Sequence, residues 1–453
     1  MNHEQGARRM VGWLAFHLLV VLTPVAAAEV PEAYQAAWKA AAPQINANIE
    51  RYRKGDAVIS VVGADGQPLK DASLAIRQRT HEYLFGCNLF VLGQLATPEL
   101  NRKYEQAFTR LFNFATIPFY WRELEPADGK PRFAEGSEPM WRRPPPDQLV
   151  KWCKAHGITT KGHALMYVKT KFMPDWIDPK DPARLKTLAA RHMAEIAQRY
   201  GNDIAVWDVV NEEIPRLTRP EQWHQVPDDY LAWCFEEAGR LFPKQARLLI
   251  NDGTSQSHVT TDLYEGLIKG LQQRNVRVEG VGIQFHIYNR EAMLSGKLYP
   301  PEQMTAVYER LGRFGLPLYM TEITVNSTGE DGPARQGEVV ANLYRLWFST
   351  PAMAGVTWWN LGDGTAFGNE NKALGGLMDE NMDPKPAYQA LDRLINHDWK
   401  TNLSTKTDAQ GQAQFRGFYG KYTVEVASGG QTRQFEINLA HKGPSQFKLT
   451  FKP

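Results

Sequence analysis

Eight short apolar segments, each followed by a stretch of helix length, constrain the fold of this chain more than any other feature. They read YLFGCN, FNFATI, ITTKGH, IAVWDVVN, ARLLIND, GVGIQFH, LPLYMTE and GVTWWN, between residues 83 and 360. Continuous apolar runs are typical of strands that are buried on both faces, as in a parallel sheet. Eight strand–helix units therefore predict an α/β fold, a (β/α)8 TIM barrel, over residues 80–397.

The segments that flank the predicted barrel have β character. A helix is expected over Glu32–Arg53, followed by DAVISVV and SLAIRQ around GADGQP, a pattern typical of a hairpin with Asp65–Gly66 at its turn. After the barrel, AQFRGFYG, KYTVEVA, TRQFEINL and SQFKLTF predict four antiparallel strands. Neither piece is large enough to fold alone. Because the two ends of a closed barrel lie close together, we expect residues 29–79 and 400–453 to form one small β-sandwich-like module.

The N-terminus has the pattern of a signal peptide over residues 1–28. Arg8 and Arg9 precede an apolar run from Val11 to Val25, and VAAAEV supplies small residues for cleavage near Ala28. We expect an exported protein, periplasmic or extracellular, with no membrane partner after cleavage. An uncleaved anchor is the alternative, although the run is short for a membrane span.

Charge and cysteine content narrow the possible partners. The formal net charge of +2 gives no electrostatic reason to expect a nucleic-acid partner. The three cysteines, Cys87, Cys153 and Cys234, are far apart and have no metal-ligand spacing. We therefore expect buried free thiols and no metal. We also expect a monomer that needs no cofactor.

Most of the eight segments end on polar or aromatic residues, at the strand ends where barrel enzymes carry their active sites. In WDVVNEEI, we expect Glu212 to face the barrel mouth and Glu213 to point away. Glu322 ends the segment three units later, and strands four and seven of a barrel face each other. Two opposed carboxylates are what glycoside hydrolysis requires, one protonated and one ionised.

Three further strand-end residues support this interpretation. His286 can hydrogen-bond Glu322 and keep it ionised, Asn211 can reach a sugar hydroxyl, and Trp359 can offer a flat surface to a sugar ring. Each of these residue types is more often structural when taken alone. Their joint placement at the strand ends of one barrel favours the functional interpretation.

The motifs FGCNL, WRELEPADGKPRF, GHALMY, WDVVNE, GIQFH, YMTEI, WWNLGD and GGLMDENMDPKPAY occur in this order over about residues 80–395. In this the chain resembles glycoside hydrolase family 10, the endo-β-1,4-xylanases. The resemblance implies a retaining mechanism, with Glu212 as acid/base and Glu322 as nucleophile. It also implies a sugar subsite at the point of cleavage that is lined by His163, Asn211, Gln284, His286 and Trp359.

The sequence departs from the family pattern at positions that would line the cleft. Where xylanases carry Glu-Asn and then Lys before the tryptophan of the W…EP motif, this chain has apolar residues and a tyrosine. Three positions elsewhere, where the family has Trp, His and Asp, also differ. The residues concerned are Ile117, Pro118, Tyr120, Tyr167, Val168 and Thr324. Tyr120 and Tyr167 are expected to contact substrate. Loss of several charged hydrogen-bond partners predicts an altered specificity, for a decorated xylan or another β-linked glycan or glycoside.

Two alternatives remain open from the sequence. One is a carbohydrate-binding protein with weak or no catalysis, although both carboxylates are present. The other gives the terminal β module a carbohydrate-binding role, for which Phe415, Phe418, Tyr419 and Tyr422 are the stacking candidates. Packing of these aromatic residues within the module is the simpler explanation. In either case the expected partner is a polysaccharide or oligosaccharide.

Overall fold

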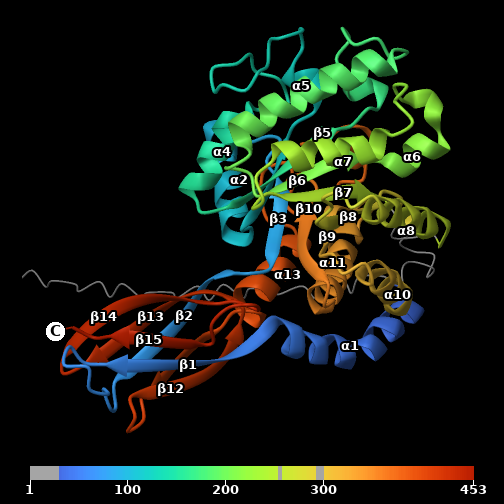
Figure 1. The fold of residues 1–453 in the computed structure, drawn as a ribbon. Coiled ribbons are helices and arrows are strands. Elements are labelled where there is room, and N and C mark those ends of the chain that lie inside the picture. Colours follow the sequence, from blue (N-terminus) through green and yellow to red (C-terminus); the bar gives the residue numbers. More distant parts are fainter. Residues whose placement is uncertain (1–29, 254–257, 292–299, 453) are drawn as a thin grey trace, which may run out of the picture.

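The computed structural model describes residues 30–253, 258–291 and 300–452, so the predicted signal peptide lies outside the described residues. Within them, the eight apolar segments form a closed parallel barrel with the strand order β10-β3-β4-β5-β6-β7-β8-β9 (Figure 1). Its strands are β3 (Leu84–Asn88), β4 (Phe114–Pro118), β5 (Thr159–Met166), β6 (Val206–Asn211), β7 (Arg247–Asp252), β8 (Gly280–Ile287), β9 (Leu318–Val325) and β10 (Met353–Trp358). The predicted fold class is confirmed.

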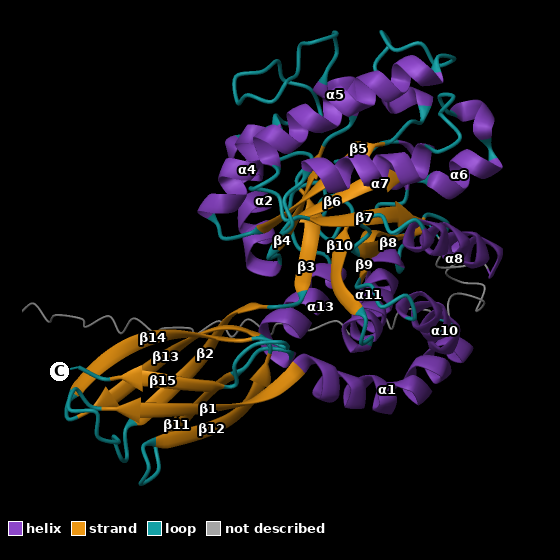
Figure 2. Ribbon diagram, in the orientation of Figure 1, coloured by secondary structure: helices purple, strands orange, loops and turns teal. Residues whose placement is uncertain are grey.

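Helices follow the strands and surround the barrel (Figure 2). They are α2 (Pro98–Leu111), α3 (Trp121–Leu124), α4 (Pro146–Ala155), α5 (Pro182–Tyr200), α6 (Glu213–Thr218), α7 (Tyr230–Leu241), α8 (His258–Gln273), α10 (Pro301–Gly312), α11 (Gly332–Ser349), α12 (Gly368–Lys372) and α13 (Pro386–Arg393). Short turns of other helix types are η1 (Thr170–Phe172), η2 (Pro220–Gln222) and η3 (Leu394–Asp398). Proline in the first turn of α2, α4, α5, α10 and α13 fits these helix starts, because the first-turn N–H groups have no intrahelical acceptor.

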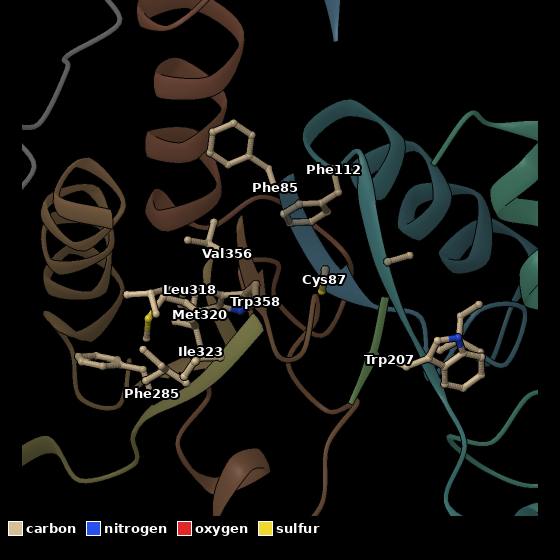
Figure 3. Packing of buried hydrophobic residues seen from close by; sticks show 14 of the residues in the cluster. Phe85, Cys87, Phe112, Trp207, Phe285, Leu318, Met320, Ile323, Val356 and Trp358 are labelled. Atoms are coloured by element: carbon tan, nitrogen blue, oxygen red, sulfur yellow. The ribbon is translucent and has the colours of Figure 1, made fainter. Parts of the chain in front are cut away.

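The barrel core explains why the segments read as continuous apolar runs. Every residue of β6 and β9 is buried, and Figure 3 shows Met320, Ile323 and Trp358 in the packed cluster. Trp207 lies against Gly162 on the neighbouring strand, where a Cβ atom would come within 2.1 Å of the indole ring. Glycine is therefore required at position 162 for the tryptophan to fit between the strands.

The two chain ends together form a module of two sheets beside the barrel (Figure 1). After α1 (Glu32–Arg53), β1 (Lys54–Val62) pairs with β12 (Gln412–Phe418) and β15 (Gln446–Thr450). The other sheet has the order β11-β2-β13-β14, with β2 (Ser73–His81), β11 (Asn402–Lys406), β13 (Gly420–Ser428) and β14 (Gln431–Leu439). N-terminal strands thus sit in both sheets, each between C-terminal partners.

The predicted hairpin of β1 and β2 is wrong. The turn exists, with Gly66 at φ 79° and its N–H donating to Gly63 O at 3.0 Å, but the chain crosses here from one sheet to the other. The tail is also not purely antiparallel, because β15 runs parallel to β1. Each strand buries one alternating face, such as Ile59 and Val61 of β1. Pairing on separate sheets lets these faces meet across the module, which a simple hairpin would not.

The core of this module comes from both ends of the chain. Ile59, Val61 and Ile76 pack in one cluster with Val424 and Val426. Of the four aromatic residues considered for sugar stacking, Phe415, Phe418 and Tyr422 are buried, and Tyr419 is partly buried. The structure thus favours packing over a stacking surface for these side chains.

The module joins the barrel at the amino ends of the barrel strands. β2 ends at His81 and β3 begins at Leu84, so the chain passes directly from one to the other. Arg53, the last residue of α1, donates to Phe348 O at 2.5 Å, Thr350 O at 2.6 Å and Met353 O at 2.7 Å around the end of α11. Trp399 stacks on Phe348 at 4.2 Å. The module therefore lies away from the barrel mouth.

Two smaller predictions concern thiols and helices. Cys87, Cys153 and Cys234 are free and buried, as expected. None of the helices that the structure describes has the length and apolar character needed to cross a bilayer.

Candidate active site

The turn after β6 separates the two adjacent glutamates of WDVVNEEI. Glu212 has a left-handed backbone with φ 58°, which costs a non-glycine residue about 1 kcal/mol, and its N–H donates to Asn251 O at 3.0 Å. Glu213 begins α6, is buried, and holds Arg216 through contacts of 2.6 and 2.8 Å. Glu212 keeps a side chain that is 20% exposed. The two adjacent glutamates are thus separated, since Glu213 is tied to Arg216 of α6 and Glu212 stays partly exposed.

Glu322, on β9, is enclosed by hydrogen-bond donors. Its Oε1 accepts from Asn251 Nδ2 and from Gln284 Nε2, both at 3.1 Å. Its Oε2 lies 3.3 Å from His286 Nε2, and His286 Nδ1 lies 3.0 Å from Thr324 Oγ1. The side chain is 7% exposed. The carboxyl is therefore fixed in one orientation by one side chain of β7 and two of β8.

The charge state of Glu322 follows from two opposing effects. Burial raises the pKa of this carboxyl, but the hydrogen bond from His286 and the charges of His163, His286 and Lys161 lower it more, so that the net pKa lies below the ordinary glutamate value. Glu322 is therefore held as the carboxylate, the form that a nucleophile requires.

Asn251 connects the two halves of the site and was not among the residues predicted from the sequence. Its Nδ2 donates to both Asn211 Oδ1, at 2.7 Å, and Glu322 Oε1, and Gln284 Nε2 also reaches Asn211 Oδ1, at 3.2 Å. Asn211 precedes Glu212, so one amide network links the ends of β6, β7, β8 and β9. The only sequence signal was the polar pair that ends RLLIND.

A buried charge network lies beneath this amide network. Asp208 Oδ2 accepts from Lys161 Nζ at 2.6 Å and contacts His163 Nδ1 at 2.8 Å. Burial raises the pKa of Asp208, but Lys161 and His163 outweigh it and the pKa is lowered overall. With Nδ1 on Asp208, the other ring nitrogen of His163 lies 3.9 Å from Glu322 Oε1. Asp208 and Lys161 thus orient His163, and both were missed because they lie inside the strands.

Glu212 has a cationic and a phenolic neighbour. Lys169 Nζ lies 3.3 Å from Glu212 Oε2 and 5.2 Å from the centre of the Trp223 ring. Burial, the Glu212 charge and a hydrogen bond to that carboxylate raise the pKa of Tyr167 far above its ordinary value, so its hydroxyl remains protonated. Lys169 was not predicted, because the sequence gives no sign that the loop after β5 reaches α6.

A second carboxyl close to Glu212 belongs to Asp252, at the end of β7. It accepts from Ile214 N at 2.7 Å and Gly253 N at 2.8 Å. Burial raises its pKa to about 8, with a further contribution from the charges of Glu212 and Glu213. Asp252 therefore ties β7 to the first turn of α6, which carries Glu213.

An aromatic wall forms one side of the site. Phe90, Tyr120 and Trp359 pack together, and Tyr167 and Phe172 contact them. The Trp359 ring is 5.3 Å from both Phe90 and His163, edge to face, and the residue is only 3% exposed. Trp359 and Tyr120 thus both lie against the His163 ring, and most of their surface is covered.

The loop of residues 132–146 closes over this wall. Arg142 donates to Asn360 Oδ1 at 2.7 Å and to Thr365 O, and its guanidinium lies 5.3 Å from the centres of the Phe90 and Phe367 rings. The Arg143 guanidinium lies 3.9 Å from the centre of the Tyr120 ring. Ile117 is buried near the end of β4. Aromatic rings and arginines therefore occupy the side of the site where the family pattern has polar groups.

The nine predicted site residues fall into two connected groups. Glu212, Glu322, His163, Asn211, Gln284 and His286 belong to the hydrogen-bonded centre, and Tyr120, Tyr167 and Trp359 belong to the aromatic wall. The contact between His163 and Trp359 joins the groups. Within the part of the chain that the structure describes, no cluster of His, Cys, Asp and Glu side chains could hold a metal ion.

Comparison with known families adds a sequence match. Residues 90–393 match the model of glycosyl hydrolase family 10. Among curated proteins, the anti-sigma-I factor RsgI6 of Acetivibrio thermocellus is 23% identical over 90% of this chain and 50% of its own length. Endo-1,4-beta-xylanase 1 of Arabidopsis thaliana is 23% identical over 88% of this chain and 39% of its own length. The chain therefore spans half or less of these relatives.

Solved structures show the same fold. Xylanase 10B from Thermotoga petrophila RKU-1, in complex with xylobiose, aligns with a TM-score of 0.56 and 22% identity, over 70% of this chain and 95% of that chain. Native xylanase 10B from Thermotoga maritima aligns with the same TM-score and identity, over 70% and 96%. At this identity the likeness supports the barrel architecture and leaves the chemistry to the site itself.

Proposed function

The chain belongs to glycosyl hydrolase family 10, and on that premise we propose that it is a retaining β-glycoside hydrolase that cleaves a xylan-type polysaccharide. One observation carries the proposal: the two strand-end carboxylates lie in different environments. Glu322 is enclosed by three donors with a lowered pKa, and Glu212 is more exposed at a strained turn. Such a difference is how paired carboxylates take separate roles.

The proposed reaction has two steps. In the first, a Glu322 carboxylate oxygen forms a bond to the anomeric carbon, the glycosidic C–O bond breaks, and Glu212 gives its proton to the leaving oxygen. In the second, Glu212 takes a proton from water, the water oxygen bonds the same carbon, and Glu322 leaves. Two inversions give net retention of configuration.

The surrounding residues have supporting roles in this proposal. Because the bonds that Asn211 makes within the described chain use Oδ1, its NH2 group is available to a sugar hydroxyl. Gln284 and His286 orient Glu322, and His163, fixed by Asp208, faces the same carboxylate. Lys169 and Tyr167 hold Glu212 at the mouth of the barrel.

A second candidate keeps the mechanism and changes the substrate to another β-linked glycan. The aromatic wall of Phe90, Tyr120 and Trp359, closed by Arg142 and Arg143, favours it. A xylose unit that depends on charged partners there would lose them. The wall instead suits an apolar or aromatic group, or a differently substituted sugar.

Reducing-sugar release on a panel of glycans tests the proposal. The panel contains plain, arabinosylated and glucuronosylated xylans, mixed-linkage glucan, cellulose and aryl β-glycosides. We expect activity on xylan that disappears in Glu322→Ala and persists in Glu330→Ala, a control at an exposed carboxylate on the following loop. The first product should be the β-anomer by NMR. Activity confined to other glycans would support the second candidate, and an α-anomeric first product would contradict the retaining mechanism.

We also propose export of the chain and action as a monomer. The basic residues and apolar run of residues 1–28 support export. Expression of the full chain in a bacterial host, followed by mass spectrometry of the mature N-terminus, should find cleavage near Ala28, and intact residues 1–28 would contradict it. Light scattering after size-exclusion chromatography should give the mass of one chain.

A further inference from the structure

A polar pocket of about 390 Å³ lies at the carboxyl ends of β8 and β9. It is lined by residues 288–290, by Asn326 and Thr328, and by Asn369 and Lys372 of α12. We call it the Tyr288 pocket. The Tyr288 ring stacks on His286 with a centroid distance of 5.1 Å and an interplanar angle of 12°. Since His286 contacts Glu322, the pocket adjoins the reaction centre without belonging to it.

The lining of the Tyr288 pocket carries two cations and no carboxylate. Lys372 is exposed and, within the described chain, forms no ion pair. Arg290 reaches Asp331 only at 3.5 Å, and Asp331 is also bound by Arg335. Both cations therefore keep donors that can serve a ligand.

The acidic side chains next to the Tyr288 pocket are already engaged. Glu370 lies between Asn369 and Lys372 in sequence, but its Oε2 accepts from Asn360 Nδ2 at 3.3 Å and lies 3.9 Å from Arg142. Asp331 pairs with the arginines named above. The lining itself therefore offers two cations to an anion, Arg290 and Lys372. On the other side, at the Tyr288 hydroxyl, burial and the carboxylates of Glu370, Glu322 and Glu212 raise the pKa of the phenol.

The floor of the Tyr288 pocket is rigid. Asn326 Nδ2 donates to Tyr288 O at 2.9 Å, and Asn326 Oδ1 accepts from the N–H of Thr328 at 2.9 Å and from its hydroxyl at 2.8 Å. The side chain of Asn326 therefore shapes the pocket. The Tyr288 hydroxyl and the Asn369 amide have no hydrogen-bond partner within the described residues, and they can bind hydroxyl groups.

We propose that the Tyr288 pocket binds a uronic acid branch of the glycan whose backbone occupies the cleft. Guanidinium and ammonium groups pair with a carboxylate through charge-assisted hydrogen bonds, and amide and phenol groups match the hydroxyls of the same sugar. The pocket has room for one monosaccharide. This inference rests on the proposed hydrolase function and names its substrate as an acidic, branched one.

The test compares two xylo-oligosaccharides of equal length, one plain and one with a single glucuronic acid branch. kcat/KM is measured for both with the full chain and with Lys372→Met, Arg290→Gln and the double variant. The ratio of acidic to plain substrate should fall about fivefold or more in each single variant and further in the double variant. A third oligosaccharide with an arabinose branch should show no such fall.

Lys244→Met is the matched control, because Lys244 is exposed and precedes β7 at the opposite end of the barrel. It should leave the ratio unchanged. An unchanged ratio in the double variant, or an equal fall for the arabinose branch, would overturn the inference. If no oligosaccharide is hydrolysed, the proposed function fails, and calorimetric binding of the acidic oligosaccharide then decides the pocket. Weaker binding of the acidic oligosaccharide by the double variant would support the uronic acid site in the Tyr288 pocket, and equal binding would refute it.

Discussion

Glu212 and Glu322 have the same side chain and different surroundings. Glu322 accepts from two amides and contacts an imidazole inside the barrel mouth. Glu212 stands on a turn with φ 58°, with Lys169 at 3.3 Å and part of its surface exposed. The strained turn persists because Asn251 O and the first turn of α6 hold it, and such strain is concentrated at functional sites. Environment, not residue type, assigns the two proposed roles.

Replacing Glu212 should affect substrates according to their leaving groups. Glu212→Gln cannot donate a proton, so hydrolysis of a xylo-oligosaccharide should fall about 10²–10⁴-fold in kcat/KM. A dinitrophenyl glycoside needs no protonation on departure, so its kcat/KM should change little. Steady-state kinetics with both substrates measure the difference, and Glu221→Gln on η2 (Pro220–Gln222) is the exposed control. Equal losses on both substrates would contradict the acid/base role.

The acid limb of the pH profile should report on Glu322. Because its folded pKa is lowered, Glu322 stays ionised down to a pH below the ordinary glutamate range, and activity is lost only as pH falls through that lowered pKa. His286→Ala removes a hydrogen bond that lowers the pKa, so the acid limb should move to higher pH. The pH dependence of kcat/KM for an aryl glycoside is the measurement. An acid limb that stays in place would rule out this role of His286.

At the scale of elements, the end of α11 is the joint between barrel and module. The last carbonyl groups of a helix have no partners inside it. Arg53 at the end of α1 donates to Phe348 O in the last turn of α11, to Thr350 O just after it and to Met353 O at the start of β10. The Arg53 guanidinium also lies 4.7 Å from the centre of the Tyr83 ring, just before β3. One side chain thus connects α1, α11 and the segment that enters the barrel.

Arg53→Met should destabilise the protein by about 2–4 kcal/mol, because it leaves several carbonyl groups without a donor. Arg51→Met, two positions earlier in the same helix and exposed, should cost less than about 0.5 kcal/mol. Urea unfolding followed by circular dichroism measures both. Equal midpoints for the two variants would show that the Arg53 contacts carry no stability.

At the scale of the whole molecule, strands that precede the barrel and strands that follow it share one hydrophobic core. Ile76 of β2 pairs in register with Val424 of β13, although all eight barrel strands lie between them in sequence. The barrel closes through β10 and β3, which brings both flanks to the same place. The module therefore packs at the amino ends of the strands, opposite the site, and supports the barrel there (Figure 1).

A charge placed on a C-terminal strand of the module core should also destabilise the N-terminal strands β1 and β2. Val424→Asp buries a carboxylate without a partner and should destabilise the module by about 3 kcal/mol or more. Hydrogen exchange should then become faster at residues 54–62 and 73–81. Glu425→Ala, on the exposed face of the same strand, should leave exchange unchanged. Faster exchange limited to residues 420–439 would contradict a shared core.

The sequence by itself determined the barrel, the helix Glu32–Arg53 and the location of the site. Burial on both faces produces continuous apolar runs, and carboxyl ends of parallel strands meet at one rim, so Glu212, Glu322 and His286 could be placed from local patterns. These patterns can be recognised in the sequence because they depend only on residues that are close together along the chain.

Tertiary structure alone decided which side chains meet. Asn251 and Asp208 lie inside strands and read as part of a buried run, yet they orient Glu322 and His163. Lys169 contacts Glu212 because the loops after β5 and β6 meet. β1 and β2 lie in separate sheets because each pairs with strands of the C-terminal tail. Pairings between segments far apart in sequence depend on the complete packing of the barrel and module, and no local pattern encodes them.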